Sequence, residues 1–199
     1  MTTAAPITLT KDMGAADLPG VTRLAIGASW DATSGGEGGI VGWAKRKRGC
    51  DLDAIAVLMQ DGEPVRLAGL DSLDPIQNGS VVHSGDNQTG HGDGDDETVT
   101  VDFPKVPGNV DAIVFVCAAF KKGSAFDKAM NVSFKVYDAS DGVPGIVADI
   151  WPSLLGAGNA CAVAKAVRGP GGWTLEVVNK RGTIRQGDQT SLLRFAIGM

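Results

Sequence analysis

The twelve residues from Asp86 to Glu97 are rich in oxygen ligands for a metal ion. They read Asp-Asn-Gln-Thr-Gly-His-Gly-Asp-Gly-Asp-Asp-Glu and include five carboxylates but no lysine or arginine. Folding this segment into a compact loop would bring like charges close together, which is unfavourable. A hard divalent cation removes the repulsion, and carboxylate, amide and backbone oxygens are the ligands that calcium prefers. The segment therefore predicts a calcium site.

We expect side chains of this segment to supply ligands, together with backbone carbonyls. Its glycines allow the chain to turn carbonyls inward, because glycine accepts positive φ without penalty. The order of acidic residues differs from the EF-hand loop, and the segment occurs only once, unlike RTX nonapeptides. The ligands expected here are Asp86, Asn87, Thr89, Gly90, Asp93, Asp95, Asp96 and Glu97.

A second acidic element lies upstream, where Asp51 and Asp53 lead into an apolar run. Residues i and i+2 of a strand project from the same face, so the two carboxylates form a half-site at a strand entrance. Asp31 ends another expected strand and could reach the same end of the fold. We include these three as metal ligands; their division between ions stays open.

These ligands need a scaffold, and period-two alternation between turn residues predicts one made of strands. Residues 60–63, Gln-Asp-Gly-Glu, indicate a hairpin turn. We expect an all-β fold: a two-sheet antiparallel β-sandwich with long metal-binding loops and one or two short helices, forming a single domain over residues 1–199. The expected strands cover residues 22–26, 53–59, 65–67, 98–103, 113–120, 131–137, 173–178 and 193–197.

Two segments favour helix. Ser124 and Asp127 have the spacing of a capping box, which predicts one or two turns ending near residue 131. Residues 159–168 are rich in alanine and are helical by propensity. Their alternation fits a strand almost as well, so both interpretations remain open.

Composition limits the partners and the compartment. The chain has 199 residues, a net charge of -5 and a pI near 4.9, which argues against nucleic-acid binding. Three cysteines without a CxxC pair indicate reduced thiols. No signal peptide is visible, and the longest apolar run is too short to span a bilayer. We expect a cytoplasmic protein.

We expect a calcium-binding, non-catalytic protein that acts as a calcium-dependent scaffold or partner-binding module. Two other functions compete with this one. In a metal-dependent hydrolase, His83 or His91 could act as a general base. Zinc would require more His or Cys ligands, and no nucleophile elbow, P-loop or dinucleotide fingerprint is present, so we expect no enzyme. We expect each histidine instead to donate a hydrogen bond that braces the loop. A calcium-dependent membrane module is the other alternative, with the basic run at residues 45–48 attracting anionic lipid or simply facing solvent.

The segment 79–97, Gly-Ser-Val-Val-His-Ser-Gly-Asp-Asn-Gln-Thr-Gly-His-Gly-Asp-Gly-Asp-Asp-Glu, resembles the signature of the TerD/TerE family of tellurium-resistance and stress-response proteins. The resemblance continues through residues 27–31, 51–54, 106–120, 131–138 and 172–173. It implies a calcium-binding β-sandwich with two neighbouring ions. It also implies a cytoplasmic bacterial protein without demonstrated catalysis, whose partners are proteins of the same stress system; peripheral membrane contact stays open.

Overall fold

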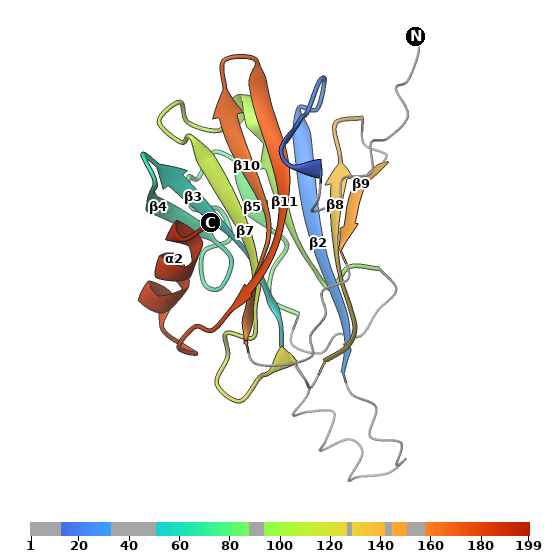
Figure 1. Ribbon diagram of the computed structural model, residues 1–199, viewed down its shortest axis with the longest axis vertical. Helices are drawn as coiled ribbons and strands as arrows, with labels where there is room; N and C mark the ends of the chain where they lie inside the picture. Colours follow the sequence, from blue (N-terminus) through green and yellow to red (C-terminus); the bar gives the residue numbers. More distant parts are fainter. Residues whose placement is uncertain (1–12, 33–50, 88–93, 127–128, 142–144, 151–157) are drawn as a thin grey trace.

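The computed structural model describes residues 13–32, 51–87, 94–126, 129–141, 145–150 and 158–199. Two antiparallel sheets pack face to face, which confirms the expected mainly-β, two-sheet architecture (Figure 1). One sheet has the strand order β1-β11-β10-β7-β3-β4 and the other β5-β6-β2-β8-β9. The strands are β1 Ala16–Asp17, β2 Arg23–Ala32, β3 Asp53–Gln60, β4 Glu63–Ala68, β5 Val81–His83, β6 Glu97–Asp102, β7 Ala112–Ala118, β8 Ala129–Asp138, β9 Gly145–Ile150, β10 Ala160–Gly169 and β11 Gly172–Gly182. A 3₁₀ turn, η2, covers Phe103–Lys105, and helix α2 covers Gln189–Ile197.

The main core lies between the sheets and follows from alternation along the strands. In β6, Val99 and Val101 are buried while Thr98 and Thr100 are only partly covered. In β2, Leu24 and Ile26 point into the same core. Because alternate side chains of a strand point to opposite faces, this pattern fixes which face of each strand is inside.

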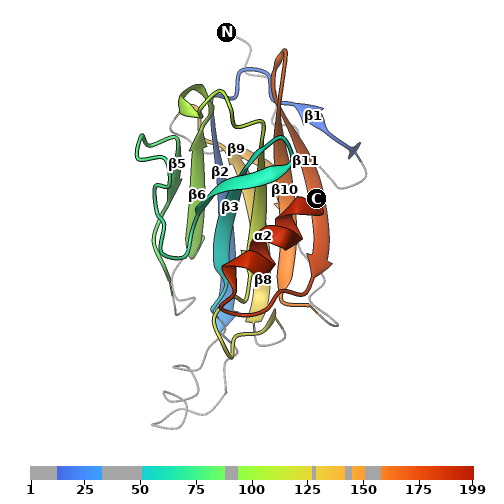
Figure 2. The same ribbon diagram turned by 90° about the vertical axis from the view of Figure 1, so that its left-hand side faces the viewer.

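A second apolar layer covers the outer face of the six-stranded sheet. All seven residues of β7 are buried, which confirms the expectation of a strand covered on both sides. Helix α2 lies across this outer face, as the two perpendicular views show (Figures 1 and 2). It packs Leu192 and Ala196 against a cluster that includes Val57 and Val114.

The hairpin expected at residues 60–63 is confirmed. Strands β3 and β4 pair with Gln60 opposite Glu63. The two turn residues, Asp61 and Gly62, have φ values of 53° and 81°. Positive φ at both positions is typical of the tight turn that matches strand twist, and the Asp-Gly pair adopts it readily.

The strand expected over residues 193–197 is wrong, because these residues belong to α2. The Asp188 carboxylate caps the helix by accepting hydrogen bonds from the backbone N–H groups of Thr190 and Ser191, at 3.0 and 3.3 Å. The helical spacing of Leu192 and Ala196 then buries one face. No helix in the described part of the chain has the length and apolar character that crossing a membrane requires.

The helix suggested by alanine propensity at residues 159–168 is also wrong, and the strand alternative holds. Strand β10 pairs with both β7 and β11. Burial between these neighbours outweighs the weak preference of alanine for helix. The helix expected from Ser124 falls partly on residues 127 and 128, which lie outside the described residues, and β8 begins at Ala129.

Candidate metal centre

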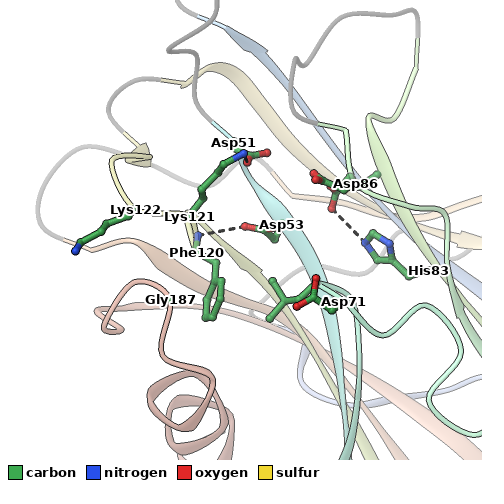
Figure 3. Close-up of a pocket in the computed structure, with 11 residues that line it drawn as sticks. Asp51, Asp53, Asp71, His83, Asp86, Phe120, Lys121, Lys122 and Gly187 are labelled. Carbon is green, nitrogen blue, oxygen red and sulfur yellow. Dashed lines mark hydrogen bonds and ion pairs between the residues drawn. The ribbon is translucent and has the colours of Figure 1, made fainter.

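Several of the acidic residues singled out in the sequence lie together at one end of the sandwich. Strands β3 and β6 begin there, and β5 and β7 end there. A pocket of about 420 Å³ opens at this end (Figure 3). Four expected ligands, Asp51, Asp53, Asp86 and Glu97, line it together with Leu70, Asp71, His83, Phe120, Lys121, Lys122 and Gly187. The fold therefore joins the upstream carboxylate pair to both ends of the acidic segment.

Glu97 connects the two sheets beneath this pocket. Its side chain is 1% exposed, and its Oε2 accepts a hydrogen bond of 2.8 Å from the Ala54 N–H in β3 of the opposite sheet. Its Oε1 accepts another, of 3.0 Å, from the Asn87 N–H. A buried carboxylate is tolerated when donors surround it in this way. Glu97 thus ties β3, β6 and the start of the acidic segment together.

The expectation that His83 braces the loop is confirmed. The Gly85 N–H donates to His83 Nδ1 at 3.0 Å, so Nδ1 is the acceptor and Nε2 carries the proton. Nε2 then donates to Glu97 Oε2 at 3.2 Å. Both ring nitrogens are engaged, which leaves neither free to act as a general base in this arrangement. His91 lies outside the described residues.

The upstream carboxylates carry negative charge that their surroundings balance poorly. Asp51 is 5% exposed; its Oδ2 lies 3.1 Å from Lys121 Nζ, and its Oδ1 has no hydrogen-bond partner among the described residues. Asp53 Oδ2 accepts a hydrogen bond of 3.2 Å from the Phe120 N–H. Burial raises the pKa of Asp51 in spite of Lys121. Burial, and then the charges of Glu97 and Asp51, raise the pKa of Asp53 to about 8. A positive charge close to these carboxylates would favour their ionised forms.

Asp96 attaches the acidic segment to β2. Its Oδ2 accepts from the Trp30 N–H at 2.9 Å, and its Oδ1 accepts from Asn87 Nδ2 at 3.0 Å. The Asp96 N–H donates to the Ala28 carbonyl at 2.8 Å. Two of the expected ligands, Asp96 and Asn87, thus bond to each other and to the frame of the sandwich.

Asp95 is not brought to the pocket. It lies over Gly27 in β2, where a Cβ atom would overlap its carboxylate. Since Leu24 and Ile26 face the core, Gly27 faces the opposite side of the sheet. Asp95 also hydrogen-bonds Tyr137 of β8, and burial followed by this bond raises the pKa of the tyrosine. The acidic segment therefore sends consecutive carboxylates in different directions.

The remaining expected ligands lie outside the described part of the chain. They are Thr89, Gly90, Asp93 and the side chain of Asp31, whose backbone belongs to β2. Within the described residues, no three His, Cys, Asp or Glu side chains are grouped so that they could hold a metal ion. The carboxylate oxygens of Glu97 and Asp96 accept hydrogen bonds from the protein's own donors, whereas Oδ1 of Asp51 and Oδ1 of Asp95 have no partner among the described residues.

The most important pocket residue that sequence patterns do not indicate is Lys121. It follows β7 in a Lys-Lys pair that looks like ordinary surface sequence. Its place beside Asp51 depends on the register of β7 with β3, which sets Ala118 opposite Asp53. Only the pairing of β3 with β7, two strands far apart in sequence, would reveal it, and no local spacing does.

The donor chemistry of the pocket fits a hard cation. Its described lining offers carboxylate oxygens and no cysteine, and the nitrogens of its single histidine are engaged. Zinc sites use thiolate and imidazole ligands, whereas calcium uses oxygens in irregular geometry. The unpartnered, buried Oδ1 of Asp51 is an atom that such an ion would satisfy.

Comparison with known proteins places the chain among others of the same fold. The TerD domain family model matches residues 6–185. The chain is 33% identical to "Stress response protein SCP2" of Bacillus subtilis (strain 168) over 129 residues, which cover 61% of this chain and 64% of that protein. It is 36% identical to "Tellurium resistance protein TerZ" of Serratia marcescens over 121 residues, 59% of this chain and 60% of that protein. The matched region thus spans less than two thirds of these relatives.

A solved structure supports the fold. The crystal structure of a homologue of telluride resistance protein (TerD) from Streptomyces coelicolor A3(2) superimposes with a TM-score of 0.66. The two chains are 19% identical, and the match covers 82% of this chain and 92% of the other. The solved structure supports the fold, and the family match over residues 6–185 shows that the chain belongs to the TerD domain family.

Proposed function

We propose that this protein binds calcium at the described pocket and acts by binding rather than by catalysis. The observation that carries the proposal is the buried Asp51 Oδ1, which has no hydrogen-bond partner among the described residues, in a pocket shared with Asp53, Asp86 and Glu97. An unpaired buried acceptor costs about 1–3 kcal/mol, more when it is charged. A divalent ion would remove this cost and the repulsion among the carboxylates.

Different carboxylates would have different roles. Asp51, Asp53 and Asp86 would contribute ligands to the ion, because all three line the pocket. Glu97 and Asp96 would orient the acidic segment, since their oxygens already accept backbone and amide hydrogen bonds. The resemblance to the family suggests a second ion, for which we propose the ligands Asp31, Thr89, Gly90, Asp93 and Asp95.

Calcium binding would couple metal concentration to the stability of this end of the sandwich. An ion that binds only the folded state stabilises it by RT ln(1 + [L]/Kd), or about 2.7 kcal/mol at a hundredfold excess over Kd. The names of the relatives support a role in tellurium resistance or the general stress response. We propose that the calcium-loaded surface is recognised by protein partners of that system in the bacterial cytoplasm.

Calorimetric titration with calcium tests the proposal directly. Asp51→Asn should weaken binding about tenfold, since it removes the charge of the most buried ligand. Asp102→Asn is a matched control, because Asp102 belongs to the opposite end of β6 and pairs with Lys105 at 2.6 Å. It should change the affinity less than about twofold, in line with the small effect of exposed ion pairs. Absence of calcium binding to the unmodified protein would refute the proposal.

A further inference from the structure

The candidate pocket contains a cation of its own. Lys121 Nζ lies 3.1 Å from Asp51 Oδ2, and the lysine side chain is 55% exposed whereas that of Asp51 is 6% exposed. We propose that Lys121 is an internal competitor for calcium: the ion must displace it from Asp51, and this displacement sets the affinity of the site. The inference rests on the proposed calcium binding and extends it, because it assigns control of affinity to a residue that is not a ligand.

The backbone that carries Lys121 is held firmly against the pocket. The Phe120 N–H donates to Asp53 Oδ2 at 3.2 Å, and the Gly187 N–H donates to the Phe120 carbonyl at 2.9 Å. The side-chain amide of Gln186 donates to two backbone carbonyls that flank the lysine, at 2.8 and 2.6 Å. One short segment therefore brings a donor to Asp53 and an ammonium group to Asp51.

The two partners of this ion pair differ in how easily they can separate. The half-exposed ammonium can return to water at little cost, as for other exposed lysines. Asp51 is buried, so its charge needs another cation once the lysine leaves. The ammonium also supplies one charge and pairs with only one Asp51 oxygen, in a pocket lined by five carboxylates. A divalent ion would therefore interact more favourably with the pocket carboxylates than the ammonium group of Lys121 does.

The neighbouring residue provides an internal control. Lys122 lines the same pocket and carries the same charge. Figure 3 shows that its side chain points away from Asp51, whereas the side chain of Lys121 points toward it. Loss of either charge alters the general potential of the pocket similarly, but only Lys121 occupies the carboxylate that calcium would bind.

The experiment is a calorimetric calcium titration of the unmodified protein, Lys121→Gln, Lys122→Gln and Lys121→Arg. Lys121→Gln should raise calcium affinity about five- to tenfold, and Lys122→Gln less than about twofold. Lys121→Arg should keep the affinity near that of the unmodified protein, because it retains the ion pair. With chelator, Lys121→Gln should melt below Lys122→Gln, and saturating calcium should abolish this difference.

The outcomes separate this inference from the function on which it rests. Clear calcium binding by the unmodified protein with equal affinity in Lys121→Gln overturns the competitor role while the calcium site stands. A lowered affinity in Lys121→Gln, or an equal rise in Lys122→Gln, also overturns it. If none of the four proteins binds calcium, both the proposed function and this inference fail.

Discussion

The connection that Glu97 makes between the two sheets can be tested by Glu97→Gln. Glutamine has the same shape as glutamate but only one acceptor oxygen, because its other terminal atom is an NH₂ group. Glu97 accepts three hydrogen bonds, from the backbone N–H groups of Ala54 and Asn87 and from Nε2–H of His83. The substitution therefore sets at least one donor against another donor in a buried site.

The expected loss of stability follows from counting these donors. If the new carbonyl takes the place of Oε2, the bonds from Ala54 and His83 survive and only the Asn87 N–H is left unsatisfied. An unsatisfied buried donor costs about 1–3 kcal/mol, and because Asn87 is only partly buried we expect a loss near the low end, about 1 kcal/mol. For a protein of this size, each kcal/mol lowers the melting temperature by about 2–4 °C. Glu97→Ala should cost more, since all three donors lose their acceptor.

The assay is urea denaturation in the presence of chelator, which isolates this effect from metal binding. Glu63→Gln serves as the control, because Glu63 begins β4 in an exposed position. It should change the free energy of unfolding by less than about 0.5 kcal/mol. If Glu97→Gln were as stable as this control, the three hydrogen bonds would not hold the sheets together and the reasoning would be wrong.

Three further predictions concern pH, packing and capping. In metal-free protein the pKa of Asp53 is about 8 when folded, above its ordinary value of 3.8. The folded state therefore binds the Asp53 proton more tightly than the unfolded state does. The stability that this contributes is present in full below pH 3.8 and is lost as the pH rises through about 8. Urea denaturation with chelator should therefore show stability falling by a few kcal/mol from about pH 5 to pH 8, with a smaller fall in Asp53→Asn; a flat profile would contradict this. Gly27→Ala should cost about 1–3 kcal/mol because its Cβ overlaps the Asp95 carboxylate, and adding Asp95→Ala should restore stability in the same denaturation assay; a neutral Gly27→Ala would count against this packing. Asp188→Ala should cost about 1 kcal/mol through loss of the α2 cap, whereas Asp188→Asn should retain the cap. Calorimetry should find the calcium affinity unchanged in both variants. A large change in affinity would show that the α2 cap influences the pocket.

The parts of the fold that local patterns could predict are those in which local and tertiary preferences agree. The alternation of β6 and the apolar run of β7 each point to a single burial pattern, and the structure has it. Residues 193–197 alternate like a strand, yet the cap at Asp188 and the spacing of Leu192 and Ala196 make a helix. In β10, alanines favour helix locally, but pairing with β7 and β11 determines the outcome.

The candidate site also has features that local sequence patterns could predict and features that they could not. The charge density of residues 86–97 could indicate a cation site, because repulsion depends on composition alone. The sequence could not indicate that Asp53 would meet Glu97 from the opposite sheet, since that depends on how the two sheets pack. The sequence could not indicate that Lys121 lies beside Asp51 either, because its position depends on strand register.

The number of carboxylates in an acidic motif therefore overstates the number of its metal ligands. Asp95, Asp96 and Glu97 are consecutive, yet they bond to Tyr137, to the Trp30 N–H and to the Ala54 N–H, on three different elements. Each of these bonds removes lone pairs that the composition would assign to calcium. Asp51, outside the motif, combines a place in the pocket with a buried oxygen that has no hydrogen-bond partner among the described residues, whereas the similarly unpartnered Oδ1 of Asp95 lies over Gly27, away from the pocket. In this protein Glu97 and Asp96 of the acidic segment tie strands together beside the pocket, and on the proposal made above the upstream pair, with Lys121 beside Asp51, would determine how strongly the pocket binds calcium.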